Sequence, residues 1–492
     1  MRSRERWLIL LLCLAAALRV FVYAAAFPFF SNGDEDLHFD LVTQYAGGRL
    51  PRTFDVLKSE SMDFISLYCS PEFLQGPDAF PDGRFPGPLW KQPAAEAAPI
   101  IEITRAAWQR EVNWESSQPP LYYAVAGCWW RMGQLVGLRG IESLYWIRFL
   151  NAPLIFLVVW LGYLTSRMVA PEHLGLRLGV PLLLAFMPQD VFYVMSNDVL
   201  SPVCFGAVFL CLLRWWQADP PGRRLAVLTG LAVGATYLTK LSNLPLLTIA
   251  LLAVLTKFMA TMRRQPRAAA LALVIMVICA GIPILSWMVW SQLHFTGITG
   301  SGPTVALLGW TRKPLAEWWH HPIFSVRGLW VFWSEVMARF WRGELMWHNL
   351  EFQSDAADHF YIISSLLFLC LALARIQRAA DSLAMPPALW LAFFSFLAAV
   401  AFLALLSVQF DFGQCVYPSR DHPYFTSGRL ISGALIPFAL CYVYGVTRLW
   451  RGAGEVALTL GMVALIALLA VASEIAIKRD VFASEHNWYH LP

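Results

Sequence analysis

The sequence predicts an all-α, polytopic membrane protein, built as a bundle of about eleven transmembrane helices with further helices on the outer membrane surface. The chain of 492 residues is 58% hydrophobic and only 14% charged, a composition typical of helical membrane proteins. Many of its 22 Trp residues flank long apolar runs, as an interfacial aromatic belt requires. The net charge of +4 is too small to indicate nucleic-acid binding, and no Gly-rich nucleotide-binding loop is found.

The first apolar run predicts a transmembrane helix with a cytoplasmic N-terminus. Residues 1–6 are basic, and residues 7–29 are apolar. That run exceeds the roughly 20 residues that span a bilayer and is longer than the core of a usual signal peptide. Residues 30–118, which are rich in Pro, Gly, Asp and Glu, then form a first outer loop.

The segment 121–138 decides the topology, because it is apolar but interrupted by Trp129-Trp130-Arg131. If it crossed the membrane fully, the later basic loops would lie outside, against the positive-inside rule. If it enters as a half-helix, those loops face the cytoplasm. We therefore predict a half-helix, which is tolerated where it lines a polar cavity. The crossings that follow are 146–166, 178–196, 199–213, 225–239, 243–256 and 270–292.

The remaining chain continues the same pattern within a single membrane domain, 1–492. Outer loops are predicted at 293–357 and 410–427, and crossings at 359–374, 387–409, 430–447 and 456–477. Cys69 and Cys415 are the cysteines that fall in outer loops. An oxidising compartment would permit a disulfide between them, although two free thiols remain the alternative.

The stretch 31–40 concentrates acidic side chains directly after the first helix. It contains Asp34, Glu35, Asp36 and Asp40 together with His38. If it is helical, Asp34 and His38 lie on one face at i, i+4. One carboxylate is then a candidate general base, with His38 orienting it or a phosphate group. The alternative is a solvated loop in which Asn32 or Asp34 caps a helix.

Three more isolated polar residues fall at predicted outer helix ends. Asp198 follows Asn197 and is a candidate acidic group or a helix cap. Lys240 lies between two apolar segments, where a lysine is either functional or extends its amine to the interface. Arg429 opens an inward helix and is either a phosphate ligand or an interfacial anchor.

These residue types suit one reaction, the transfer of a sugar from a lipid phosphate. A carboxylate removes a proton from an acceptor hydroxyl or amine, and the acceptor attacks the sugar carbon. Cations stabilise the charge that develops on the leaving phosphate. A divalent metal is compatible with this chemistry, but no zinc-type ligand spacing is found, and the adjacent His320 and His321 do not define a site.

The order of motifs also resembles a known superfamily. The motifs are Gly33-Asp34-Glu35 with His38, Gln118-Pro119-Pro120-Leu121-Tyr122-Tyr123, Arg148-Phe149-Leu150, Asn197-Asp198, Thr239-Lys240 and Gly428-Arg429. This order resembles the GT-C integral-membrane glycosyltransferases and is similar to protein O-mannosyltransferases and lipid A aminoarabinose transferases. It is closest to a bacterial branch with a Pro-Asp-Glu-x-x-His motif, and the match covers roughly residues 1–250.

The resemblance implies an inverting, usually metal-independent transfer from a polyprenyl-phosphate-linked sugar to an envelope glycan, lipid or protein. It would take place at the periplasmic face of a bacterial inner membrane. The implied catalytic residues are Asp34 or Glu35, with Asp198. The implied substrate-binding residues are His38, Gln118, Tyr122, Arg148, Lys240 and Arg429. Two departures, Gly33 for the common proline and Ser117 before Gln118, place the donor-phosphate contacts in question.

Two non-catalytic functions remain as alternatives. A flippase or transporter for lipid-linked sugars is one, although the duplicated halves that many transporters show are not found. A non-catalytic subunit of a polysaccharide assembly complex is the other, with the acidic loop as its docking surface.

Overall fold

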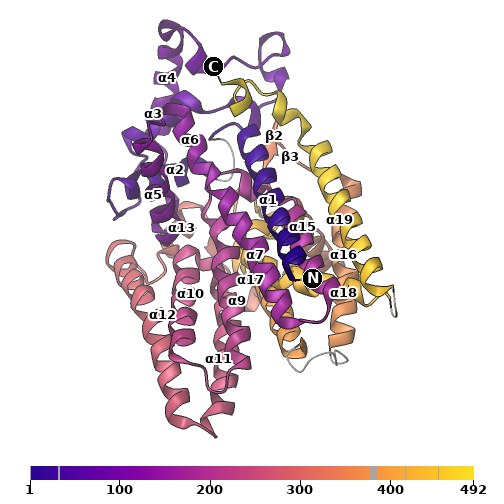
Figure 1. The fold of residues 1–492 in the computed structure, drawn as a ribbon. Helices are drawn as coiled ribbons and strands as arrows, with labels where there is room; N and C mark the ends of the chain where they lie inside the picture. The colour runs from indigo at the N-terminus through magenta and orange to yellow at the C-terminus, as the bar shows by residue number, and fades with distance from the viewer. Residues whose placement is uncertain are drawn as a thin grey trace.

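The computed structural model describes residues 2–30, 34–376, 385–415, 417–450, 452 and 454–491, and these residues are mostly helical (Figure 1). Within these ranges the strands form two short antiparallel ribbons. Strand β1 (Thr311–Arg312) pairs with β4 (Phe410–Asp411), and β2 (Met346–Trp347) pairs with β3 (Leu350–Glu351). The predicted all-α, polytopic class is confirmed.

Nine spans in the described residues are long and apolar enough to cross a membrane. They are built from α1 (Arg2–Ala26), α6 (Gly140–Phe149) with α7 (Asn151–Val169), α9 (Ser201–Gln217), α11 (Leu244–Met262), α12 (Pro266–His294), α16 (Asp355–Arg375), α17 (Met385–Gln409), α18 (Leu435–Thr447) and α19 (Glu455–Ile477). Two further predicted crossings correspond to shorter helices, α8 (Leu174–Phe186) and α10 (Arg223–Thr239). Helix α8 packs on α7 and α19, and α10 packs on α9 and α12, so both belong to the bundle.

The outer helices gather at one end of this bundle, at the upper left in Figure 1. They are α2 (Glu35–Ala46), α3 (Ser59–Tyr68), α4 (Ala94–Trp108) and α5 (Leu121–Leu135). At about 22 Å, α5 is too short to span the roughly 30 Å core of a bilayer. It packs closely on α2, because a Cβ on Gly127 would lie 2.9 Å from the backbone nitrogen of Ala46.

The second outer loop carries α13 (Ser301–Leu307), α14 (Leu315–Trp318) and α15 (Val326–Arg342). Ser325 caps α15 by accepting a hydrogen bond from the Gly328 backbone N–H. The short 3-10 turns of the described residues are η1 (Pro71–Phe73), η2 (Pro77–Ala79), η3 (Pro81–Gly83), η4 (Leu89–Lys91), η5 (Trp114–Ser117), η6 (Asp190–Tyr193), η7 (Asn197–Leu200), η8 (Leu241–Asn243), η9 (Pro322–Phe324), η11 (Gly428–Ala434), η12 (Arg479–Ala483) and η13 (Trp488–His490).

The prediction of a continuous crossing at 178–196 is wrong. Helix α8 ends at Phe186, and the chain from Met187 to Ser196 is extended except for η6. Pro188 disfavours a helical conformation at the residue before it. Side chains of this irregular segment then satisfy backbone groups of the second outer loop: Asp190 accepts hydrogen bonds from the Glu344 and Leu345 backbone N–H groups.

Buried charges tie α1 to α19. The Arg19 guanidinium on α1 contacts Glu474 on α19 at 2.9 Å and also donates to the Tyr193 hydroxyl at 2.6 Å. Lys478 lies 3.4 Å from Glu474 and 3.7 Å from Asp190. Because an unpaired charge inside a membrane bundle is costly, this network fixes both helices against η6.

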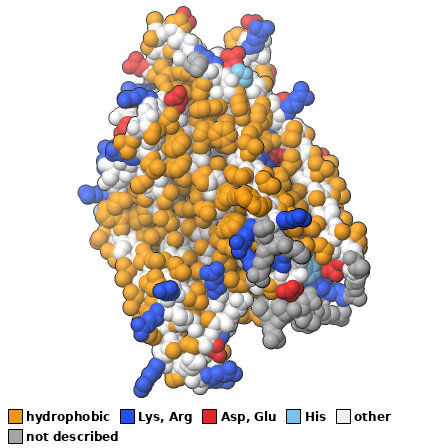
Figure 2. Space-filling model, viewed as in Figure 1, with side chains coloured by type: hydrophobic (Ala, Val, Ile, Leu, Met, Phe, Trp, Pro, Cys, Tyr) orange, Lys and Arg blue, Asp and Glu red, His pale blue; other side chains and the backbone are white. Residues whose placement is uncertain are grey.

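The surface is consistent with a membrane location. In Figure 2 hydrophobic side chains cover the middle of the visible face, and Lys and Arg side chains gather at its lower end. That end includes the start of α10 and the turn between α11 and α12. The turn carries Arg263 and Arg264, and Arg267 follows at the start of α12. Cys69 and Cys415 are free thiols, and the Cys415 thiol donates to the Leu308 carbonyl oxygen, so the structure contains no disulfide between them.

Candidate active site

The site begins with Asp34, which precedes α2. Its backbone is left-handed (φ 62°), a conformation that Asp adopts more readily than most residues. The Asp34 carboxylate accepts from the Arg429 guanidinium at 2.9 Å, and each side chain is 28% exposed. Arg429 lies on η11, 395 residues further along the chain. The fold therefore brings the first acidic motif and the last basic motif into contact.

A second ion pair adjoins the first. The Lys240 amine, at the end of α10, lies 2.7 Å from the Asp198 carboxylate on η7. Arg429 Nε lies 4.0 Å from the other Asp198 oxygen, so the two pairs form one array. We call Asp34, Arg429, Asp198 and Lys240 the charge cluster. Its order alternates carboxylates with cations, so each charged group lies beside at least one group of opposite charge.

The charge cluster opens into a cavity of about 190 Å³. Asp34 and Arg429 line it, together with Asp190, Val191, Val194, Ser196, Glu344, Leu345 and Met346. Several of these residues belong to the irregular segment between α8 and α9. The break in that predicted crossing thus supplies one wall of the site.

His38 packs behind Asp34. Its Nδ1 is 2.9 Å from the Tyr123 hydroxyl, which also accepts from the Asn197 amide at 3.4 Å. Burial lowers the pKa of His38 to about 3, with the positive charges of Lys240 and Arg429 acting in the same direction. His38 is therefore neutral near pH 7 and serves as a hydrogen-bonding group.

Asp34, unlike His38, is charged near pH 7. Burial raises its pKa, but the charge of Arg429, the hydrogen bond from that guanidinium and the charge of Lys240 outweigh this effect, so its pKa lies below the ordinary range. Asp34 is consequently an ionised carboxylate that faces the cavity. Asp36 is different, because burial and the negative charge of Asp34 raise its pKa to about 7.

Glu35 and Arg148 are not part of the charge cluster. They form a fully buried ion pair at 2.5 Å, and Glu35 also accepts from the Phe30 and Met195 backbone N–H groups. Arg148 donates in addition to the carbonyl oxygens of Phe27 and Pro28. All acceptor and donor groups of the pair therefore face protein, and the pair holds the start of α2 to α6.

The two remaining sequence-predicted residues lie beside the site. Gln118 accepts from the Asn197 amide at 3.4 Å, and the buried Tyr122 packs edge-on against Tyr123. Both lie next to the wall formed by Tyr123 and Asn197. Residues 31–33, including Gly33, lie outside the described residues.

Sequence analysis missed Glu115, on η5. Its backbone N–H donates to Asn113, and its Oε2 atom is buried without a hydrogen-bond partner in the described structure. Burial, and then the negative charge of Asp34, raise the pKa of Glu115 to about 7, while Lys240 and Arg429 oppose this rise. The available signal was its position just before the Gln118-Pro119-Pro120 motif.

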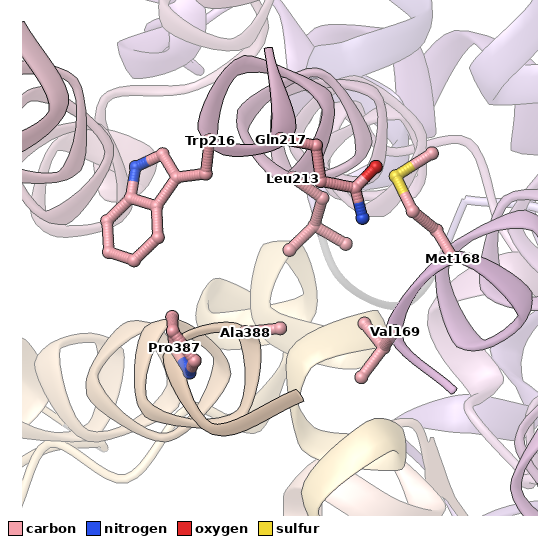
Figure 3. A pocket seen from close by; sticks show the side chains of 7 residues that line it. All are labelled: Met168, Val169, Leu213, Trp216, Gln217, Pro387 and Ala388. Carbon is pink, nitrogen blue, oxygen red and sulfur yellow. The ribbon is translucent and has the colours of Figure 1, made fainter. Parts of the chain in front are cut away.

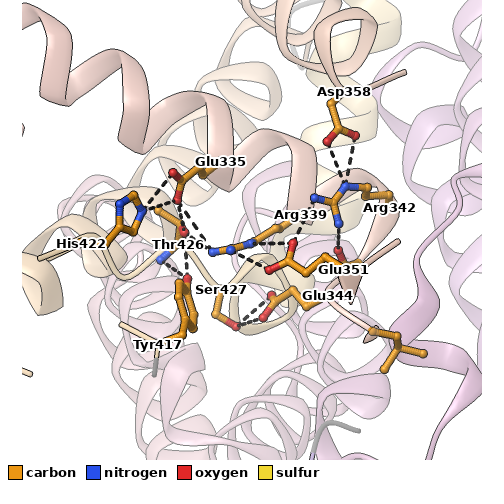
Figure 4. Close-up of polar contacts among 12 residues, drawn as sticks. Glu335, Arg339, Arg342, Glu344, Glu351, Asp358, Tyr417, His422, Thr426 and Ser427 are labelled. Carbon is orange, nitrogen blue, oxygen red and sulfur yellow. Dashed lines mark hydrogen bonds and ion pairs between the residues drawn. The ribbon is translucent and has the colours of Figure 1, made fainter. Parts of the chain in front are cut away.

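An extended network of ion pairs supports η11 (Figure 4). Glu344 accepts from the Ser427 hydroxyl at 2.9 Å and from the Arg429 backbone N–H at 3.0 Å. Arg339 and Arg342, at the end of α15, both bind Glu351, and Arg342 also binds Asp358. These contacts fix the backbone on which Arg429 sits.

Two other features were considered as candidate sites, a second cavity and groups of metal-ligating side chains. A further cavity of about 250 Å³ lies at the opposite ends of α7 and α9, where Met168, Leu213, Trp216 and Pro387 offer mainly apolar side chains (Figure 3). Among the described residues, no group of three or more His, Cys, Asp or Glu side chains is placed to hold a metal ion. The charge cluster is the candidate site, because it brings together four of the residues that the sequence predicts, Asp34, Asp198, Lys240 and Arg429.

Comparison with known proteins identifies a family. No curated protein sequence matches the chain. Similar solved structures include ArnT from Cupriavidus metallidurans bound to undecaprenyl phosphate, with 12% identity, a TM-score of 0.42 and coverage of 97% of this chain and 74% of that one. Another is the Archaeoglobus fulgidus oligosaccharyltransferase in complex with zinc and sulfate, with 12% identity, a TM-score of 0.38 and coverage of 75% and 44%. These are similarities of fold alone. A family described as "Predicted membrane protein (DUF2142)" matches residues 18–415, and the chain belongs to this family.

Proposed function

We propose that this protein is a membrane glycosyltransferase that moves a sugar from a polyprenyl-phosphate-linked donor to an acceptor at the outer face of the membrane. The charge cluster is the observation that carries this proposal. Two carboxylates alternate with two cations, and Asp34 and Arg429 of this cluster line a cavity where the membrane helices meet the outer helices. An ionised base beside paired cations is what proton removal and a departing phosphate require.

The reaction proceeds by displacement at the sugar carbon. Asp34 accepts the proton of an acceptor hydroxyl or amine, and the acceptor oxygen or nitrogen forms a bond to that carbon. The bond between the carbon and the donor phosphate oxygen breaks, and the phosphate leaves with the electron pair. Arg429 and Lys240 stabilise its negative charge, because guanidinium and ammonium groups bind phosphate oxygens strongly.

The other residues have supporting roles in this proposal. Asp198 lies 2.7 Å from Lys240 and positions its amine. Neutral His38 and Tyr123 hold the wall behind Asp34. Glu35 is buried in its ion pair with Arg148 and fixes the start of α2, so Glu35 does not replace Asp34 as the base. Gln118 and Tyr122 belong to the wall next to Asn197 and Tyr123.

The test is a mass profile of envelope glycans and glycolipids from cells that lack the gene. The cells are complemented with wild type, with Asp34→Asn, or with Asp36→Asn. Asp36 is a matched control, because it lies two residues away and its pKa of about 7 leaves it partly neutral already. Wild type and Asp36→Asn should restore a mass difference of one sugar unit, and Asp34→Asn should not.

The same profile separates the alternative functions. If Asp34→Asn restores the profile as well as wild type does at equal expression, the carboxylate is not catalytic. A lipid-linked-sugar carrier or a scaffold subunit would then explain the requirement for the protein better than transfer does.

A further inference from the structure

A second polar cavity lies between the C-terminal end of α2 and the outer end of α12. Its volume is about 580 Å³, within the usual range of roughly 300–1,000 Å³ for ligand pockets. The lining residues are Gln44, Gly48, Arg49, Leu50, Pro51, Arg52, Thr53, Asp55, Lys58, Ser116 and Trp290. Nothing in the proposed transfer step uses these side chains.

The cavity is positively charged. Arg49, Arg52 and Lys58 face one acidic lining residue, Asp55. Lys58 pairs with Asp55 at 2.8 Å, and Arg49 reaches Glu60 at 3.6 Å with both side chains exposed, a weak contact. Arg52 makes no ion pair with any residue that the structure describes. The cavity therefore presents a guanidinium to an anionic ligand, and planar guanidinium groups suit phosphate oxygens.

Buried hydrogen bonds connect this cavity to the turn that bears Glu115. The fully buried Asp40 accepts from the Gln44 amide, the Lys58 backbone N–H and the Asn113 amide. Asn113 in turn accepts from the backbone N–H of Glu115. One carboxylate thus shapes the cavity walls and fixes the turn that bears Glu115, whose neighbour Ser116 lines the cavity floor.

The end of an apolar span lines part of the cavity. Trp290 belongs to α12, one of the apolar spans, and its indole N–H donates to the Pro51 carbonyl oxygen at 3.2 Å. Tryptophan is typical of the interface between lipid and water. A phosphate bound beside Trp290 can therefore belong to a lipid headgroup or to a soluble molecule.

From the charge, the volume and the link to Glu115, we propose that this cavity binds the acceptor through a phosphate group that the acceptor carries. The assignment as an acceptor site rests on the proposed transferase function, whereas phosphate binding does not. Arg52 is the principal phosphate ligand, and the acceptor's reactive hydroxyl or amine extends past Ser116 towards Glu115 and Asp34.

Binding is measured first, on purified full-length protein in phosphatidylcholine nanodiscs. Two phosphate probes are titrated, glucose 6-phosphate and short-chain phosphatidic acid, with glucose as the neutral control. Arg52→Gln should weaken binding of at least one phosphate probe about tenfold. The matched control is Arg84→Gln, which alters an exposed arginine of the same outer loop that does not line the cavity. It should leave binding within about twofold.

The two probes distinguish the sources of the phosphate. Preference for glucose 6-phosphate indicates a soluble phosphorylated glycan, and preference for phosphatidic acid indicates a lipid headgroup. The proposal is overturned if neither probe binds saturably, or if Arg84→Gln weakens binding as much as Arg52→Gln does.

A second measurement separates this proposal from the transferase proposal. In the transfer reaction, Arg52→Gln should raise the acceptor concentration for half-maximal rate about tenfold without changing that for the donor. Asp34→Asn should abolish turnover but still bind the phosphate probe. If Asp34→Asn retains turnover, the assignment of Asp34 as the base fails, and if wild type shows no turnover, the transferase assignment fails. The phosphate site stands in both cases. If Arg52→Gln behaves as Arg84→Gln in both assays, the cavity assignment alone fails.

Discussion

At the scale of single residues, neighbouring carboxylates have different surroundings. Asp34 faces a cavity and is 28% exposed, whereas Glu35 is buried against Arg148 and two backbone N–H groups. The sequence places the two acids side by side and contains no information on which one points into the protein. That distinction depends on Arg148 and Arg429, which arrive from distant parts of the chain.

The two acids should therefore respond differently to removal of their charge. Glu35→Gln leaves the buried Arg148 charge uncompensated, so we expect a loss of about 3–5 kcal/mol in the free energy of unfolding. Asp34→Asn, at a partly exposed position, should cost far less while it abolishes transfer. Denaturant unfolding of both variants in micelles measures the difference. Equal stability of the two variants would contradict the structural role of Glu35.

His38 gives the molecule a predictable sensitivity to acid. Its folded-state pKa of about 3 lies below the unfolded value of 6.5, so below pH 6.5 the unfolded state binds a proton that the folded state does not. Its contribution to stability therefore falls as the pH falls, by about 1.4 kcal/mol per pH unit. His38→Asn should flatten the pH dependence of the thermal midpoint between pH 6.5 and 5. An unchanged slope would show that other groups carry it.

Glu115 is a site residue that the sequence alone does not identify. A single acid in a long polar loop has no local feature that distinguishes it from solvated neighbours. Its raised pKa arises from burial and from the negative charges of Asp34 and Asp198, which tertiary structure brings close to it. Asp198, Lys240 and Arg429 were easier to select, because an ionisable group at the end of an apolar run is conspicuous.

At the scale of elements, hydropathy predicts helices well where the backbone is regular. It fails at 187–196, where the residues are apolar enough for a helix but fold as extended chain and η6. The hydrogen bonds of that segment go to distant elements, and one of them runs from the Gln189 amide to the Phe340 carbonyl oxygen on α15. A contact with another element, over 150 residues away, cannot be deduced from local periodicity.

The turn after α15 also makes a close contact with a distant part of the chain, at Asp190. Gly343 has φ +91°, and a Cβ there would lie 1.6 Å from an Asp190 carboxylate oxygen. Gly343→Ala should displace Glu344 and with it Arg429, reducing transfer about 100-fold. Gly309→Ala is the control, since its φ of +72° carries similar backbone strain but nothing lies within 4 Å of the new Cβ. Equal activity of both variants would show that close packing on Asp190 is unimportant.

At the scale of the whole molecule, the distribution of charge predicts orientation. The turn between α11 and α12 is basic, and the first outer loop lies at the opposite end of the bundle (Figure 1). The positive-inside rule places that turn in the cytoplasm and the charge cluster outside. The order of crossings follows from the sequence, but the enclosure of the site by segments from both ends of the chain does not.

Orientation is measured with introduced cysteines. In a variant without the exposed Cys128 and Cys370, we expect a membrane-impermeant maleimide to label Arg84→Cys on intact cells. Arg264→Cys, where the native side chain is 78% exposed, should react only after permeabilisation. Labelling of Arg264→Cys on intact cells would reverse the topology and remove the proposed outer-face reaction.

The ion pair between Arg19 and Glu474 has a consequence for biogenesis. The partners are separated by 455 residues, so α1 leaves the ribosome long before α19 is synthesised. Until then the Arg19 charge has no Glu474 to neutralise it within the bilayer, and the nascent bundle is held in an incomplete state. A chain truncated before α19 would expose an unpaired arginine at membrane depth, a feature by which quality-control proteases can distinguish unfinished from finished protein.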